Sequence, residues 1–240
     1  MSFSEYFAKA CEMNGLAGFS PLSPAFERLT ELLLAFNAHT NLTSVRTPEE
    51  TVMKHYVDSL TAAGYIPPSA KTVVDVGCGG GFPTLPLAIA LPGPEFTGLD
   101  STEKKLRFVS SAAVDLGLNV KTLCSRAEDA GRDPSLRESF DVSIARAVAR
   151  LNALCELCLP LTKPGGLFIA MKGPAGDEEA REAKIGIAAL GGEIAGIAHV
   201  TLADPLGGEG AERTMILIEK KRPTPDMYPR QYAKIVKKPL

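Results

Sequence analysis

The segment DVGCGGGFP, from Asp75 to Pro83, constrains the fold more than any other stretch of the chain. It directly follows a short apolar run at 72–76 that has the pattern of a buried strand, and a helix is expected to open at Pro83. Glycines allow positive φ and a close approach of the backbone to a ligand, and a helix start offers free N–H groups. The segment therefore predicts a strand-to-helix turn that holds a nucleoside cofactor.

Strand and helix patterns alternate after the Pro67-Pro68 break. Strands are expected at 72–76, 95–99, 120–124, 141–145 and 167–171, with helix-length segments such as 103–116 and 151–161 between them. This repetition implies an α/β fold with a mostly parallel sheet that is covered on both faces. Near the end, 194–202 and 213–220 flank a glycine-rich segment and predict an antiparallel hairpin at one sheet edge.

Residues 1–70 have helical patterns. One amphipathic helix is expected after Ser23-Pro24, and a second begins at Thr47-Pro48, where Thr47 can cap and Glu50 can close a capping box. His55, in the second helix, is expected to make a polar contact between this helical region and the sheet. The chain is thus divided into a helical cap at 1–70, a core at 71–222 and a basic tail at 223–240.

Charge is distributed unevenly along the chain. The 26 basic and 28 acidic side chains give a formal net charge of −2, which argues against a basic coat for nucleic acid. From residue 219 onward, however, seven Lys and Arg face only two acids. A basic tail therefore follows an acidic body.

The remaining composition excludes several classes. No apolar stretch is long enough to span a bilayer, and the first residues do not resemble a secretory signal. The 5 cysteines are expected to be reduced, which favours a cytoplasmic location. Cys155 and Cys158 form a C-x-x-C pair inside an apolar helical pattern and are interpreted as core thiols. His39, His55 and His199 lack metal-ligand spacing, so no metal is expected.

Asp100 lies at the carboxyl end of the second expected strand, where its carboxylate could accept hydrogen bonds from both hydroxyls of a ribose. The alternative is that Asp100 only caps the helix that starts near Thr102. A dinucleotide fingerprint G-x-G-x-x-G/A is not met, because its third position falls on Phe82 or Thr84. A nicotinamide-dependent oxidoreductase is therefore the least favoured class.

The run D-x-G-x-G-x-G with a trailing hairpin resembles class I S-adenosylmethionine-dependent methyltransferases. Further blocks, in order, are 41–43 (NLT), 55–60 (HYVDSL), 99–101 (LDS), 104–108 (KKLRF), 125–128 (SRAE), 145–147 (ARA), 171–173 (MKG), 224–230 (TPDMYPR) and 237–240 (KKPL). Together they resemble the RsmG (GidB) family, bacterial enzymes that methylate guanine N7 in 16S ribosomal RNA, with guanine 527 of the 530 loop as the family target. Thr84 and Ala233 stand where the family usually has glycine.

The resemblance implies S-adenosylmethionine as the cofactor. It implies that Gly77 and Phe82 line the cofactor, that Ala127 and Glu128 meet its adenine end, and that Arg146 closes the pocket. From the residues alone, Glu128 could equally be a solvated loop acid and Arg146 a surface ion-pair partner. With the glycine turn and Asp100, the expected cofactor-binding set is Gly77, Gly79, Phe82, Asp100, Ala127, Glu128 and Arg146.

The resemblance also implies 16S rRNA or the 30S subunit as partner, with no membrane, no metal and a monomeric state. Guanine N7 already presents a lone pair, so no catalytic acid or base is expected and positioning does the chemical work. Contacts to RNA are expected from the tail residues Arg230, Lys234, Lys237 and Lys238, with a solubilising terminus as the alternative. Two other functions stay open, a methyltransferase of a small molecule or protein and a non-catalytic RNA-binding assembly factor.

Overall fold

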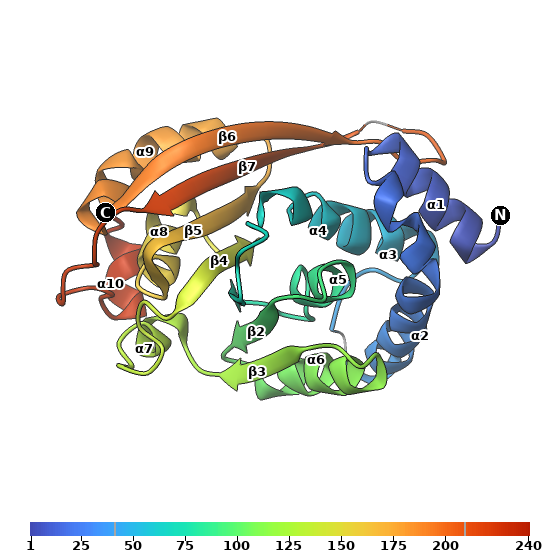
Figure 1. Cartoon of the computed structure of the whole chain (residues 1–240), viewed down its shortest axis with the longest axis horizontal. Helices are drawn as coiled ribbons and strands as arrows, with labels where there is room; N and C mark the ends of the chain where they lie inside the picture. Colours follow the sequence, from blue (N-terminus) through green and yellow to red (C-terminus); the bar gives the residue numbers. More distant parts are fainter. Residues whose placement is uncertain (41, 209) are drawn as a thin grey trace.

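The computed structural model describes residues 1–40, 42–208 and 210–240, and its strands in these ranges form one mixed sheet (Figure 1). The order across the sheet is β3-β2-β1-β4-β5-β7-β6. Neighbours from β3 to β5 pair in parallel, whereas β7 pairs antiparallel with both β5 and β6. The bounds are β1 Thr72–Val76, β2 Glu95–Asp100, β3 Val120–Cys124, β4 Phe140–Arg146, β5 Thr162–Lys172, β6 Gly192–Leu202 and β7 Ala211–Lys220. The predicted α/β fold and its terminal hairpin are confirmed.

Helices cover both faces of the sheet. Because successive residues of a strand point to opposite faces, Val74 packs in the cluster that contains α8 and α9, while Val73 packs against α5. The N-terminal helices α1 and α2 pack against α5 and α6 through Phe7, Phe26 and Phe108. The α-helices are α1 Phe3–Met13, α2 Ser23–Thr40, α3 Pro48–Thr51, α4 Asp58–Leu60, α5 Thr84–Ala90, α6 Glu103–Asp115, α7 Ala127–Ala130, α8 Leu151–Cys158, α9 Gly176–Ala189 and α10 Tyr232–Lys237.

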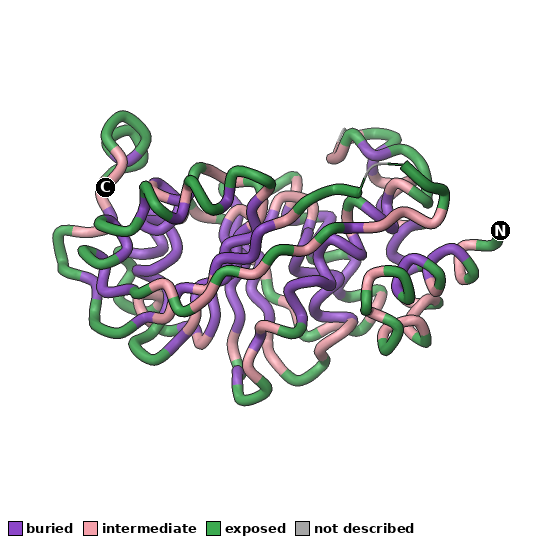
Figure 2. The backbone as a smooth tube through the Cα atoms, turned by 90° about the horizontal axis from the view of Figure 1, so that it is seen from above, coloured by how far each residue is buried: buried purple, intermediate pink, exposed green. Residues whose placement is uncertain are grey.

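Buried segments run through the middle of the molecule, and exposed segments lie mostly at its margins (Figure 2). Cys155 and Cys158 are fully buried in the core, as expected for core thiols. The first helices and α10 lie at opposite ends of the molecule (Figure 1). The division at residues 70 and 222 stays a prediction.

The helix expected after Thr47 is interrupted by a π-helical turn. Thr47 caps as predicted, because its side chain accepts a hydrogen bond from the Glu50 amide. The Glu50 carboxylate accepts from the Arg46 amide instead of the Thr47 amide, so the predicted capping box is wrong by one residue. A π-helix then spans Val52–Val57 before α4, and such turns are frequent at functional sites.

The basic tail is attached to the core. The Arg137 guanidinium donates to the backbone oxygens of Thr224 and Tyr228, at 2.7 and 2.8 Å. Further along, α10 contacts α8, and Ile235 of α10 is fully buried in the cluster that contains α8. Most other α10 residues are exposed, so the tail is an ordered element with a solvated outer side.

Candidate active site

The turn after β1 requires glycine at two positions. Gly77 has φ +74°, and a Cβ there would lie 2.7 Å from Cγ2 of Val148. Gly81 has φ +84°, and a Cβ there would lie 2.8 Å from Cδ1 of Leu85. The Gly77 amide donates to the Leu99 carbonyl at 2.7 Å, which fixes the turn against the end of β2. The predicted strand-to-helix turn is confirmed.

Asp100 braces this turn from the last position of β2. One carboxylate oxygen accepts from the Gly79 amide at 3.0 Å, and the other accepts from the Thr102 amide at 2.8 Å. The side chain thus forms an Asx turn that leads into α6 and joins the glycine turn to the neighbouring strand, while the N-cap Thr102 makes no side-chain capping bond. Asp100 also lines a cavity, so these hydrogen bonds and a ligand contact are compatible.

That cavity, which we call the α7 cavity, has a volume of about 430 Å³. It lies at the carboxyl ends of the strands, where open α/β sheets bind ligands. Gly77, Asp100, Ala127 and Glu128 of the expected cofactor set line it. Glu128 is buried, which argues against a solvated loop acid.

A second cavity, of about 550 Å³, lies between the glycine turn and the helix that contains His55, and we call it the cap cavity. Gly79, Phe82 and Arg146 line it, and Gly77 lines both cavities. The structure therefore brings all seven expected residues to two adjoining cavities that meet at the turn. Their role in binding stays a prediction.

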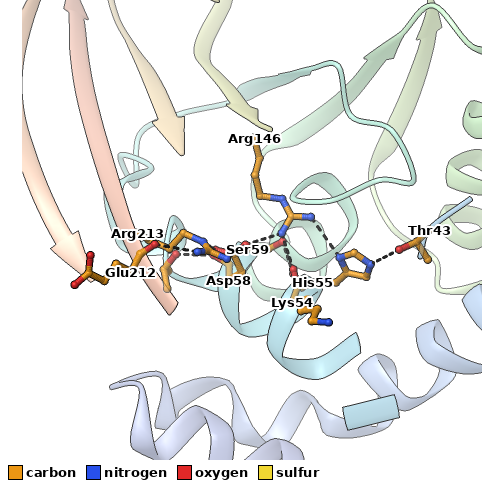
Figure 3. A network of polar contacts seen from close by, with 9 residues as sticks. Thr43, Lys54, His55, Asp58, Ser59, Arg146, Glu212 and Arg213 are labelled. Atoms are coloured by element: carbon orange, nitrogen blue, oxygen red, sulfur yellow. Dashed lines mark hydrogen bonds and ion pairs between the residues drawn. The ribbon is translucent and has the colours of Figure 1, made fainter. Parts of the chain in front are cut away.

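A polar network crosses the cap cavity from the helical region to the sheet (Figure 3). Asp58, almost fully buried, accepts from Nη1 of Arg146 at 2.9 Å and from Nε of Arg213 at 2.8 Å. Arg146 also donates to the Lys54 carbonyl at 2.8 Å. Arg146 is therefore an ion-pair partner, but inside the cavity and not on the open surface.

Sequence reasoning missed Asp58 and Arg213 as members of this site. Asp58 lies in the block 55–60 that contributes to the family resemblance, and this position could have indicated that it belongs to the site. Nothing in the sequence indicates Arg213, because it lies on β7, 155 positions from Asp58.

His55 lies against the glycine turn. Its ring stacks on Phe82 with centroids 4.2 Å apart, and Nε2 is 3.0 Å from Oγ1 of Thr43. Nδ1 is 3.4 Å from Nη2 of Arg146, so the expected contact between the helical region and the sheet is confirmed. Burial, aided by the Arg146 charge, lowers the pKa of His55 to about 4, and the ring is neutral at pH 7. Asn41, next to Leu42 in the NLT block, lies outside the described residues.

Positive charge predominates in the cap cavity. Two carboxylates, those of Asp58 and Glu179, line it together with the cationic side chains of Lys54, Lys105, Arg146, Lys172 and Arg213. Lys172 pairs with Glu179 at 2.7 Å, and Asp58 pairs with both arginines. Lys54 pairs with Glu50 at 2.6 Å and Lys105 lies 4.0 Å from Asp100, so these cations too have carboxylate partners. Such a surface attracts an anionic ligand, although the whole chain is slightly acidic.

Asp75, at the end of β1, holds a buried carboxylate that is only half satisfied. Oδ2 accepts from the hydroxyl and amide of Thr84, at 2.6 and 3.2 Å, whereas Oδ1 has no hydrogen-bond partner among the described residues. Burial raises the pKa of Asp75 to about 6. Thr84 supplies the hydroxyl.

The basic side chains of the tail differ in whether their charges are already paired within the protein. The guanidinium of Arg230 binds the fully buried carboxylate of Glu156, with a closest contact of 2.6 Å, so its charge is already paired, and the RNA contact expected from Arg230 stays a prediction. Lys234, Lys237 and Lys238 are exposed.

Among the described residues, no group of three or more His, Cys, Asp or Glu could hold a metal ion. In the same ranges, no helix is long and apolar enough to cross a membrane.

Solved structures place this architecture among methyltransferase folds. An O-methyltransferase from Bacillus cereus in complex with SAH has a TM-score of 0.54 and 21% identity, covering 79% of this chain and 90% of that one. The O-methyltransferase TomG from Streptomyces achromogenes has a TM-score of 0.53 and 17% identity, covering 80% and 90%. At these identities the likeness defines the fold, the class I methyltransferase sheet.

Sequence comparison gives the family. The family model GidB, rRNA small subunit methyltransferase G, matches residues 23–204. A ribosomal RNA small subunit methyltransferase G from Lactobacillus johnsonii is 42% identical over 240 residues, covering 98% of this chain and 99% of that protein. One from Clostridium perfringens is 39% identical over 242 residues and covers both chains completely. This chain belongs to the GidB family, which confirms the resemblance noted in the sequence.

Proposed function

We propose that this chain transfers a methyl group from S-adenosylmethionine to N7 of a guanine in 16S ribosomal RNA, with guanine 527 of the 530 loop as the expected target. Its main support is the adjacency of two cavities in a member of the GidB family. One cavity is bordered by a glycine turn and a carboxylate suited to a nucleoside, and the other is rich in positive charge. A methyl donor and an RNA base can therefore meet at Gly77.

The residues present fit the cofactor. A Cβ at Gly77 would collide with Val148, so this position of the turn requires glycine. A glycine backbone also lets a ligand approach closely. Asp100 would hold the ribose hydroxyls, and Ala127 with Glu128 would border the adenine. S-adenosylmethionine, when bound, supplies an activated methyl group on a sulfonium.

Residues of the cap cavity would hold the target base and exclude water. Arg146 and Arg213 are fixed by the buried Asp58, so their remaining donors are preorganised for a nucleotide. His55 is neutral and hydrogen-bonded, and it serves as a wall of the cavity. Because guanine N7 carries its own lone pair, the work left for these side chains is orientation.

RNA beyond the target base would be held by exposed cations. Lys234, Lys237 and Lys238 of the tail can meet phosphates of 16S rRNA or of the 30S subunit. Arg230 is not included, because its charge is paired with Glu156. We expect the protein to act as a monomer in the cytoplasm, without a metal.

Methyl transfer from radiolabelled S-adenosylmethionine tests the proposal, with 30S particles, naked 16S RNA, a small-molecule extract and total protein as acceptors. Label is expected in the RNA, at N7 of one guanine. Gly77→Ala should abolish it, because the new Cβ meets Val148, whereas Gly93→Ala should not, because nothing lies within 4 Å of that position. Label in small molecules or protein, or none in RNA, would contradict the proposal.

A further inference from the structure

Tyr232 brings the basic tail to the α7 cavity. It is the first residue of α10, and it lines the cavity together with Ala127 and Glu128. Among the lining residues that the structure describes, Tyr232 is the one aromatic side chain. The residue is 39% exposed, so part of it faces solvent while another part borders the cavity.

Two anchors fix the backbone on either side of Tyr232. On one side, Glu156 accepts hydrogen bonds from both the amide and the guanidinium of Arg230, at 2.6 Å each. On the other side, Ile235 is fully buried against the core. Because the anchors stand two residues before and three residues after Tyr232 in the sequence, the backbone of Tyr232 is held beside the cavity.

The chemistry of this position matches a flat, apolar, electron-rich ligand. Polar groups that could take a ribose, such as Asp100 and Thr102, lie at the glycine-turn side of the cavity, while Val148 and Leu157 give it apolar walls. An aromatic ring at the rim adds a stacking surface, which favours a purine base over an aliphatic group.

We propose that Tyr232 covers the adenine of the cofactor, so that the C-terminal tail completes the nucleoside site. This inference rests on the proposed function, because it assumes a nucleoside in the α7 cavity. It assigns the tail a second task besides contact with RNA. Removal of residues 223–240 would accordingly weaken cofactor binding as well as RNA binding, so a simple truncation cannot separate the two tasks.

Calorimetric titration of the full chain with S-adenosylhomocysteine tests the inference. Tyr232→Ala is expected to weaken binding about five- to tenfold, the lower part of the range for loss of an aromatic partner of a base. Tyr232→Phe should bind within about twofold of the unmodified chain, because the ring is retained. Val236→Ala is the matched control, since Val236 lies one turn further along the same helix, is 53% exposed and does not line the cavity.

A second measurement reports the contact itself. The chain has no tryptophan, so Tyr232→Trp introduces a single tryptophan at the cavity, whose fluorescence can be excited apart from that of the tyrosines. S-adenosylhomocysteine should quench its fluorescence, whereas homocysteine, which lacks adenine, should not.

Unchanged affinity in Tyr232→Ala, an equal loss in Tyr232→Phe, or fluorescence indifferent to S-adenosylhomocysteine would overturn the inference while the proposed function stands. Failure of the unmodified chain to bind S-adenosylhomocysteine would overturn both.

Discussion

Replacing the half-satisfied carboxylate of Asp75 should stabilise the fold at neutral pH. Asp75 is buried, and its pKa is raised from 3.8 to about 6, so the folded chain binds a proton more tightly than the unfolded chain. That contribution to stability is fully present below pH 3.8 and is lost as the pH rises through 6. At about 1.4 kcal/mol for each pKa unit, the ionised carboxylate costs about 3 kcal/mol at pH 7.

Asp75→Asn removes this cost. Its amide oxygen can still accept from Thr84, while its NH2 group takes the unpartnered position at a cost of about 1 kcal/mol. The net gain in the free energy of unfolding is therefore about 2 kcal/mol at pH 7.

Urea unfolding of both proteins between pH 4 and pH 7 measures the effect. The free energy of unfolding of the variant, relative to the unmodified chain, should rise by about 2 kcal/mol over this range, because part of the cost is already present at pH 4. His55, whose pKa is lowered to about 4, makes both proteins lose stability as the pH falls below 6.5, and this loss cancels in the difference. A difference that does not change with pH, or a variant less stable at pH 7, would refute the reasoning.

Three further perturbations probe the site and the tail. Asp100→Ala should weaken S-adenosylhomocysteine binding about tenfold or more in calorimetry, since the ribose hydroxyls and the glycine turn both lose an acceptor; unchanged affinity would remove the ribose role. Arg230→Ala should lower the free energy of unfolding in urea by about 3 kcal/mol, because it leaves the buried Glu156 carboxylate without its partner, and a loss below about 1 kcal/mol would contradict this. Combined Lys237→Ala and Lys238→Ala should weaken RNA binding and flatten its dependence on salt, whereas an unaltered slope would return the tail cations to a solubilising role.

The sheet and the turn could be predicted because their signals are local. Alternation of short apolar runs with helical patterns placed the strands, and the glycines of the turn stand where positive φ requires them, as at Gly77 and Gly81. Asp100 could be placed because it follows a predicted strand, and parallel strands end at one edge of a sheet.

The polar pairings of the site could not be predicted. Arg146 meets Asp58 across 88 positions, and Arg230 meets Glu156 across 74, and no periodicity links a cation to one particular distant acid. The basic composition of the tail predicted cations that contact RNA, but it did not show that a buried carboxylate on α8 pairs with one of them and fixes the tail to the core. The π-helical turn at Val52–Val57 likewise has no signal in the helical pattern around it.

A crystal structure of this chain with S-adenosylhomocysteine tests most directly whether the turn after β1 binds a methyl-donor nucleoside. We predict that the ribose hydroxyls meet Asp100, that the adenine lies in the α7 cavity beside Ala127 and Glu128, and that the sulfur faces the cap cavity. A ligand bound elsewhere, or a turn that instead holds a diphosphate, would contradict the account.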